Sequence, residues 1–150
     1  MIEFGICPLI FTLDTFVKEY VDKNFPFDRK AYLFGKRILV HKYYNKGAVL
    51  NFLADSPRLM RGIHAGALAV IAGSYLLLFQ QKGNTALKVS MGMLAGGGAG
   101  NFFDRVAKGH VVDYFSFVTP FKRLNQVVFN LSDLFIFAGA ALTCIFAGKK

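Results

Sequence analysis

The sequence predicts an all-α membrane protein with four transmembrane helices and a small β-element in its first long loop. Of its 150 residues 54% are hydrophobic, and the mean hydropathy is +0.40, which is more apolar than is usual for a soluble domain. The apolar residues come in long blocks rather than at amphipathic spacing, which is typical of helices surrounded by lipid. Two long polar segments and one short turn separate these blocks. We therefore expect one integral membrane domain over residues 1–150.

The predicted spans cover about residues 4–20, 62–79, 86–104 and 127–148. The first block is short for a full span and contains Asp14. The third is rich in glycine, and small residues let helices approach closely in lipid. The fourth is followed by two lysines at the chain end.

The links between these blocks predict the topology. Residues 80–85 form a short polar turn, whereas residues 21–61 and 105–126 are long. In the first long link, residues 37–44 are β-rich and a turn at 45–47 precedes residues 48–53, which predicts a short hairpin or small sheet. An up-down-up-down path puts both long links on one side of the membrane. The short turn and both chain ends then lie on the other side.

The acidic residues gather on the side of the long links. Of nine Asp and Glu, only Glu3 falls on the side of the short turn. Asp14, Asp104 and Asp133 lie near the loop-side ends of their predicted spans, and Asp113 lies in the second long link. Connectivity therefore predicts that three helices and one link bring carboxylates to the same membrane level. Asp133 is expected about a turn and a half inside the last helix.

Asp113 and Asp133 are the predicted catalytic pair. An ionisable side chain at membrane depth is costly and usually functional. Two neighbouring carboxyl groups in a low-dielectric site cannot both ionise easily, so one can act as base while the other acts as acid. Such a pair can hydrolyse a peptide bond with no cofactor and no metal. The alternative for each aspartate is a helix cap or a salt-bridge partner.

Polar residues near the pair are candidate supporting groups. Asn101 and Arg105 are four residues apart and share a helix face, and Asn130 lies three residues before Asp133. Asp14 and Lys18 are also four residues apart, and we favour a structural salt bridge for them. The three histidines and two cysteines show no metal-ligand spacing, and a structural disulfide is not expected.

The net charge of +9 has a membrane explanation. The Lys and Arg residues flank apolar blocks, where they attract anionic lipid headgroups. No basic helix or aromatic-basic motif supports nucleic-acid binding. About nine of the basic residues lie in residues 21–61, and the positive-inside rule would place that link in the cytoplasm. The N-terminus lacks the features of a cleaved signal peptide.

The motifs taken together resemble those of the signal peptidase II family, the lipoprotein signal peptidases. The resemblance covers most of the chain. It rests on Asp14 and Lys18 in the first span and on four ordered motifs, NKGA at 45–48, GNFFDR at 100–105, GHVVDY at 109–114 and FNLSD at 129–133. Ser132 departs from the usual alanine, which concerns substrate preference more than chemistry.

The resemblance implies an aspartyl endopeptidase with Asp113 and Asp133 as its dyad. It implies cleavage just before the diacylglyceryl-modified cysteine of prolipoproteins. Both termini would lie in the cytoplasm and the active site at the outer face of the bacterial inner membrane, with residues 36–54 as an extracytoplasmic β-element. The positive-inside rule would give the opposite orientation, and we give the motif match more weight than that rule. The supporting polar residues would be Asn45, Gly47, Asn101, Asp104, Arg105 and Asn130, together with Asp14 and Lys18.

Two alternatives remain open at this point. A small proton-coupled carrier would use the acids as a relay, although a relay should extend across the bilayer. A non-catalytic relative that binds lipoproteins would keep the same motifs. The four compact spans suggest that a monomer suffices.

Overall fold

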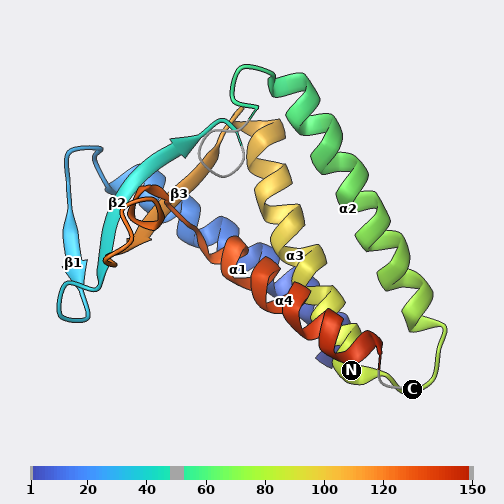
Figure 1. Ribbon diagram of the computed structural model, residues 1–150. Helices are drawn as coiled ribbons and strands as arrows, with labels where there is room; N and C mark the ends of the chain where they lie inside the picture. The colour runs from blue at the N-terminus through green and yellow to red at the C-terminus, as the bar shows by residue number, and fades with distance from the viewer. Residues whose placement is uncertain (1, 48–52, 149–150) are drawn as a thin grey trace.

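The structure is a computed structural model that describes residues 2–47 and 53–148. Four helices and a three-stranded sheet make up the described chain (Figure 1). The helices are α1 (Ile2–Asn24), α2 (Pro57–Phe79), α3 (Thr85–Ala107) and α4 (Leu131–Ala147), and the strands are β1 (Ala31–Leu33), β2 (Ile38–Asn45) and β3 (Val111–Phe117), with a 3-10 turn η2 (Leu124–Gln126) before α4.

Helix α3 is the centre of the bundle and packs against α1, α2 and α4. The sheet lies at one end of the bundle, while the beginning of α1, the end of α4 and the α2–α3 turn lie at the other (Figure 1). The predicted up-down-up-down path is thus confirmed. Glycines allow the close packing, because a Cβ at Gly96 would lie 2.7 Å from the Cys7 carbonyl and one at Gly97 would lie 2.7 Å from the Ser132 carbonyl.

Helix α1 carries its polar residues on its buried face. Residues 10, 14, 18 and 21 are buried, at the spacing of one helical stripe, whereas large apolar residues such as Phe16 and Tyr20 are exposed. This inside-out pattern is the one expected of a helix surrounded by lipid. It places Asp14 and Lys18 in the centre of the bundle.

By length and composition, α2 is the one helix in the described chain that clearly qualifies as a membrane span. Helix α4 is apolar but has only 17 residues. The buried polar residues of α1 and of the C-terminal half of α3 lower their apolar content. The prediction of four transmembrane helices is therefore confirmed only as four helices, of which α2 is long and apolar enough to cross a membrane.

The helix bounds differ from the predicted spans mainly at the ends. Helices α1 and α2 are longer, because the polar residues at their loop-side ends continue the helix past the apolar block. Helix α4 begins at Leu131 rather than near residue 127. The chain before it is extended, with Asn130 at φ −127° and ψ 178° as the N-cap.

The sheet has the antiparallel order β1-β2-β3. The predicted small sheet in the first long link is confirmed: β2 pairs with β1 across the turn at residues 34–37 and also with β3 from the second long link. Residues 48–52, the expected second half of the hairpin, lie outside the described residues. The pairing with β3 is non-local, and no local turn signal could predict it.

Candidate active site

Asp113, which the sequence places in the second long link, lies on strand β3 within that link. The register places it directly opposite Tyr43, so Asn45, two residues further along β2, lies on the same face of the sheet. The Asn45 side-chain amide donates to Asp113 Oδ2 at 3.0 Å, and the Asn45 Oδ1 accepts from the Gly47 N–H at 3.1 Å. Only 1% of Asp113 is exposed. The sheet therefore holds this carboxyl group rigidly.

Asp133 lies in the first turn of α4, nearer the helix end than predicted. It forms a capping box with Asn130, because Asn130 Oδ1 accepts from the Asp133 N–H at 3.0 Å and Asp133 Oδ2 accepts from the Asn130 N–H at 3.0 Å. The helix-cap alternative for Asp133 is thus true in part. Its other oxygen, Oδ1, accepts from the Asn101 side chain at 2.8 Å.

Asn130 connects the two aspartates. Its Nδ2 donates to Asp113 Oδ1 at 2.6 Å and to Asn101 Oδ1 at 3.0 Å. An antiparallel bridge between Phe115 and Phe129 holds this segment beside β3. One asparagine therefore contacts the Asp113 carboxyl through its amide group and the Asp133 carboxyl through its backbone, so both groups belong to one hydrogen-bonded assembly.

A buried lysine on α1 also contacts this hydrogen-bonded assembly. Lys18 Nζ donates to Asn101 Oδ1 at 2.7 Å and pairs with Asp14 at 2.6 Å and Asp104 at 3.6 Å. The predicted Asp14–Lys18 salt bridge is confirmed. Asn101 Oδ1 thus accepts from a cation, which orients the amide so that its Nδ2 faces Asp133.

The electrostatic setting of Asp113 favours its protonated form. Burial, and next the nearby Asp133 carboxylate, raise the pKa of Asp113 to about 7. The amides of Asn45 and Asn130 oppose this shift by donating to the carboxylate. At neutral pH the protonated and ionised forms of Asp113 are therefore both populated.

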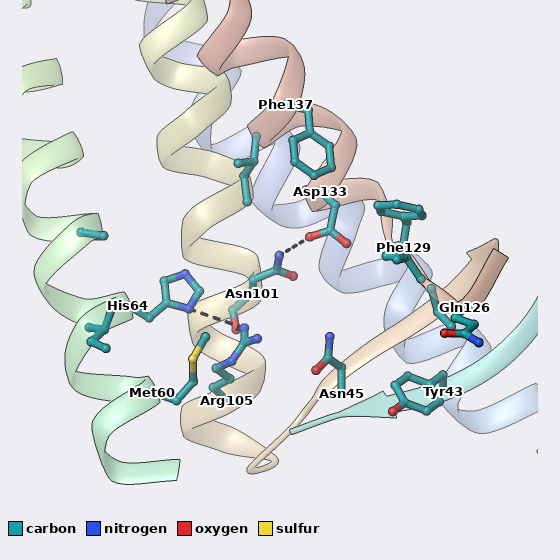
Figure 2. Close-up of a pocket in the computed structure, with 15 residues that line it drawn as sticks. Tyr43, Asn45, Met60, His64, Asn101, Arg105, Gln126, Phe129, Asp133 and Phe137 are labelled. Atoms are coloured by element: carbon teal, nitrogen blue, oxygen red, sulfur yellow. Dashed lines mark hydrogen bonds between the residues drawn. The ribbon is translucent and has the colours of Figure 1, made fainter. Parts of the chain in front are cut away.

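Asp133 faces a cavity of about 670 Å³ between α2, α3, α4 and the sheet. Figure 2 shows Asn101, Arg105 and His64 on one side of this cavity and Phe129 and Phe137 on the other. The polar groups gather near the sheet. Apolar side chains form much of the remaining wall, namely Met60, Ile63, Ala67, Val127, Val128, Phe129, Ile136 and Phe137.

Arg105 and Asp104, at the end of α3, form hydrogen bonds with different segments of the chain. Arg105 donates to the Gly47 carbonyl at 2.6 Å, which ties the end of β2 to the helix bundle. Asp104 Oδ2 accepts from the Val112 N–H at 3.2 Å, so it orients the start of β3. Of the two residues, Asp104 therefore makes the hydrogen bond to the strand that carries Asp113.

The structure brings all ten predicted site residues to the sheet end of the bundle. It adds two that carried no predicted role: the Tyr114 hydroxyl accepts from the Leu131 N–H at 2.9 Å, and the Ser132 N–H donates to Asp14 at 2.9 Å. Both contacts join segments far apart in sequence, so no local pattern indicated them. Cys7 and Cys144 are free thiols, and the described residues contain no group of three or more potential metal ligands.

A helical membrane protein with two linked carboxyl groups beside an apolar cavity has the features of a membrane protease of the aspartic class. Comparison with known families supports this class. The model of signal peptidase (SPase) II matches residues 6–148. The chain therefore belongs to the signal peptidase II family and is a membrane protease.

Curated relatives cover most of the chain. The lipoprotein signal peptidase of Pseudomonas aeruginosa is 32% identical over 159 residues, covering 99% of this chain and 93% of that one. That of Aeromonas hydrophila is 36% identical over 137 residues, covering 89% and 80%. That of Cupriavidus necator is 32% identical over 139 residues, covering 91% and 77%.

Solved structures share the fold. A bacterial membrane enzyme determined by the in meso method at 2.3 Å resolution superposes with a TM-score of 0.80, at 20% identity, over 95% of this chain and 85% of that one. A second, at 1.9 Å resolution, gives 0.78 at 19% identity over 99% and 93%. The arrangement of four helices and a small sheet is therefore shared with membrane enzymes.

Proposed function

We propose that this chain is a membrane-embedded aspartyl endopeptidase that removes signal peptides from diacylglyceryl-modified prolipoproteins. Cleavage would fall just before the lipidated cysteine. The observation that carries the proposal is the contact of Asn130 with both Asp113 and Asp133 at the polar end of an apolar cavity. The lining suits a substrate with a peptide bond beside a lipid chain.

The two aspartates would divide the acid and base roles. Asp133 lines the cavity, so its carboxylate would take the proton from a water that attacks the scissile carbonyl carbon. Asp113, whose pKa is raised to about 7, would protonate the carbonyl oxygen. When the C–N bond breaks, the leaving nitrogen takes a proton from Asp133, and Asp113 takes back a proton from a hydroxyl of the tetrahedral diol as the new carboxyl group forms. Both aspartates thus return to their starting protonation states after one turnover.

The neighbouring polar groups would bind the substrate backbone and hold the pair. Asn45 and Asn130 donate to Asp113, and Asn101 donates to Asp133. Arg105 lies at the cavity wall near its carbonyl contact with Gly47. We expect Arg105 to limit the space available around the scissile bond. This chemistry requires no cofactor or metal.

We place the protein in the bacterial inner membrane with α1–α4 crossing it and the sheet and active site toward the extracytoplasmic face. The exposed apolar side chains on α1 and α2 support contact with lipid. The basic surface of the sheet end would attract anionic lipids. One chain contributes every residue of the proposed site, so we expect a monomer to be active. No role in nucleic-acid binding is proposed.

The test is cleavage of a lipidated prolipoprotein by purified protein in detergent. Asp113→Asn and Asp133→Asn should each lower kcat/KM by at least about 10³-fold, since each removes one proton-transfer role. Asp55→Asn, an exposed position outside the cavity, is the matched control and should retain activity. Cleavage that persists in both dyad variants would overturn the assignment.

The carrier alternative is not favoured by the structure. Asp14, Asp104, Asp113 and Asp133 all lie in one network at the sheet end, and a proton path across the bilayer needs groups along its length. Absence of cleavage by the unmodified protein, together with proton flux in liposomes, would reverse this preference. Substrate binding without cleavage would indicate a non-catalytic relative.

A further inference from the structure

Arg105 also lines a second cavity, whose lining includes neither aspartate of the catalytic pair. It has a volume of about 580 Å³, and its lining residues come from the end of β2, the beginning of α2 and the end of α3. Figure 1 shows these ends of the three elements at the sheet end of the bundle. Among the described residues that line this cavity, none is acidic. Five carry or can carry positive charge, namely Lys46, Arg61, Arg105, Lys108 and His110.

Two nitrogen atoms at this cavity lack hydrogen-bond partners within the described chain, Nε of Arg105 and Nε2 of His110. Arg105 is only 7% exposed. Its terminal nitrogens are used, since Nη2 donates to the Gly47 carbonyl at 2.6 Å and Nη1 donates to the Asn101 carbonyl at 3.3 Å. A buried guanidinium N–H without an acceptor is costly, so the site favours an external acceptor.

The positive charge at the cavity is only partly neutralised. Lys108 pairs with Glu19, Asp22 and Asp104 at 3.5 to 3.7 Å. In the described part of the chain, no carboxylate forms an ion pair with Lys46 or Arg61, nor with Arg105. Lys46 and Arg61 therefore have no counter-ion among the described residues, whereas Asp113, Asp133 and Asp104 act electrostatically on Arg105.

The N-terminus of α2 adds to this field. Pro57, the first residue of this 23-residue helix, lines the cavity. The positive end of the helix dipole favours an anion there. Three features thus favour a negatively charged ligand with several acceptor oxygens: the helix end, the unpaired cations and the Arg105 Nε, which has no hydrogen-bond partner.

We propose that this cavity binds a phosphate group, with the Arg61 guanidinium and the Lys46 ammonium group as its main donors. Phosphate presents several acceptor oxygens and suits guanidinium donors. The group has two possible sources, the headgroup of an anionic phospholipid or free phosphate. The binding site is independent of the peptidase assignment, because its test measures binding and not cleavage.

The experiment uses the full-length protein and two probes. Inorganic phosphate is titrated onto detergent-purified protein by calorimetry, and retention of phosphatidylglycerol relative to phosphatidylcholine is measured by native mass spectrometry after release from mixed nanodiscs. Arg61→Gln should weaken the affinity for the preferred probe about tenfold, as expected for loss of one charge-assisted donor. Arg58→Gln is the matched control, since Arg58 lies in the same first turn of α2 but does not line the cavity.

The possible outcomes distinguish the two sources of the phosphate group and test whether the binding site exists. Selective retention of phosphatidylglycerol that is reduced by Arg61→Gln identifies the lipid headgroup. Phosphate binding without lipid selectivity identifies the free ion. Absence of both, or an equal loss in Arg58→Gln and Arg61→Gln, overturns the site. Thermal unfolding of Arg61→Gln in detergent, measured in parallel, reports a folded protein, so loss of binding cannot be confused with unfolding.

Discussion

Asn130 shows how one residue can serve both structure and chemistry. Its Oδ1 caps α4 through the Asp133 N–H, and its Nδ2 contacts Asp113 and Asn101. A hydrophobic residue could satisfy neither contact. The side-chain amide is the group that offers an acceptor and a donor at the same position.

Substitutions at this position should separate the two roles. Asn130→Ser keeps an N-cap acceptor but loses the amide donors, whereas Asn130→Ala loses both. We expect both variants to lower kcat/KM by about 10²-fold or more, since the carboxyl pair is no longer held. We expect Asn130→Ala to be less stable than Asn130→Ser by about 1 kcal/mol. The measurements are cleavage kinetics and thermal unfolding in detergent, and equal stability of the two variants would argue against the capping role.

The pH dependence of cleavage should report Asp113. Its pKa is raised to about 7, so the carboxyl group is protonated below that pH and loses its proton above it. If Asp113 is the acid, kcat/KM should fall about tenfold for each pH unit above 7. The measurement is kcat/KM from pH 5 to pH 9 at constant ionic strength. A profile that stays level up to pH 9 would assign the acid role elsewhere.

At the scale of the element, the close approach of α3 to its neighbours determines where the acids meet. A Cβ at Gly100 would lie 2.6 Å from Asp14 Oδ2 and 2.7 Å from Ser132 Oγ. This glycine lets α1 and α4 converge on α3 immediately before Asn101. The polar assembly therefore depends on a position with no side chain.

Two glycines on α3 provide a matched comparison. Gly100→Ala forces apart two buried groups and should destabilise the protein by about 1–3 kcal/mol, with a loss of activity. Gly98→Ala meets only the end of the Leu68 side chain, at 3.3 Å, and should be tolerated. Thermal unfolding and cleavage rates of the two variants give the test, and equal behaviour would show that the approach at Gly100 is not limiting.

At the scale of the whole molecule, one side chain at the end of α1 fastens the sheet to the bundle. Asp22 accepts from the Tyr44 hydroxyl at 2.5 Å and lies 3.7 Å from Lys108 Nζ, while Lys42 donates to its backbone carbonyl at 3.0 Å. The Tyr44 ring also stacks on His110, with centroids 3.9 Å apart. The sheet that carries Asp113 is thereby joined to α1 and to the end of α3.

Removal of this contact should loosen the sheet without changing the carboxyl pair itself. Asp22→Ala should increase hydrogen exchange in β2 and lower kcat/KM by about tenfold, because Asp113 is less well positioned. Asp28→Ala, at an exposed position between α1 and β1, is the control. Unchanged exchange in β2 would mean that its pairing with β3 alone holds the sheet.

Much of the site was predictable because its residues stand in ordered motifs and because connectivity places their elements at one end. Asp14, Lys18, Asn101 and Asp133 follow from a helix period within apolar blocks. The predicted position of Asp133, a turn and a half inside the last helix, was wrong. Residues 127–130 are as apolar as the helix, and only the N-cap at Asn130 shows where α4 begins. The position of Asp113 on a strand was missed, because β3 pairs with β2 across 65 or more intervening residues.

The sequence by itself determined the class of protein, the order of the elements and the end of the bundle at which the acids gather. These follow from composition and connectivity, which are properties of the chain. Only the tertiary structure decided which side-chain amide donates to which carboxyl group. It also decided that Asp113 lies on a paired strand and that basic residues line a second cavity beside Arg105. Those features depend on strand register and on helix approaches of a few ångströms, and both are set by packing between residues distant in sequence.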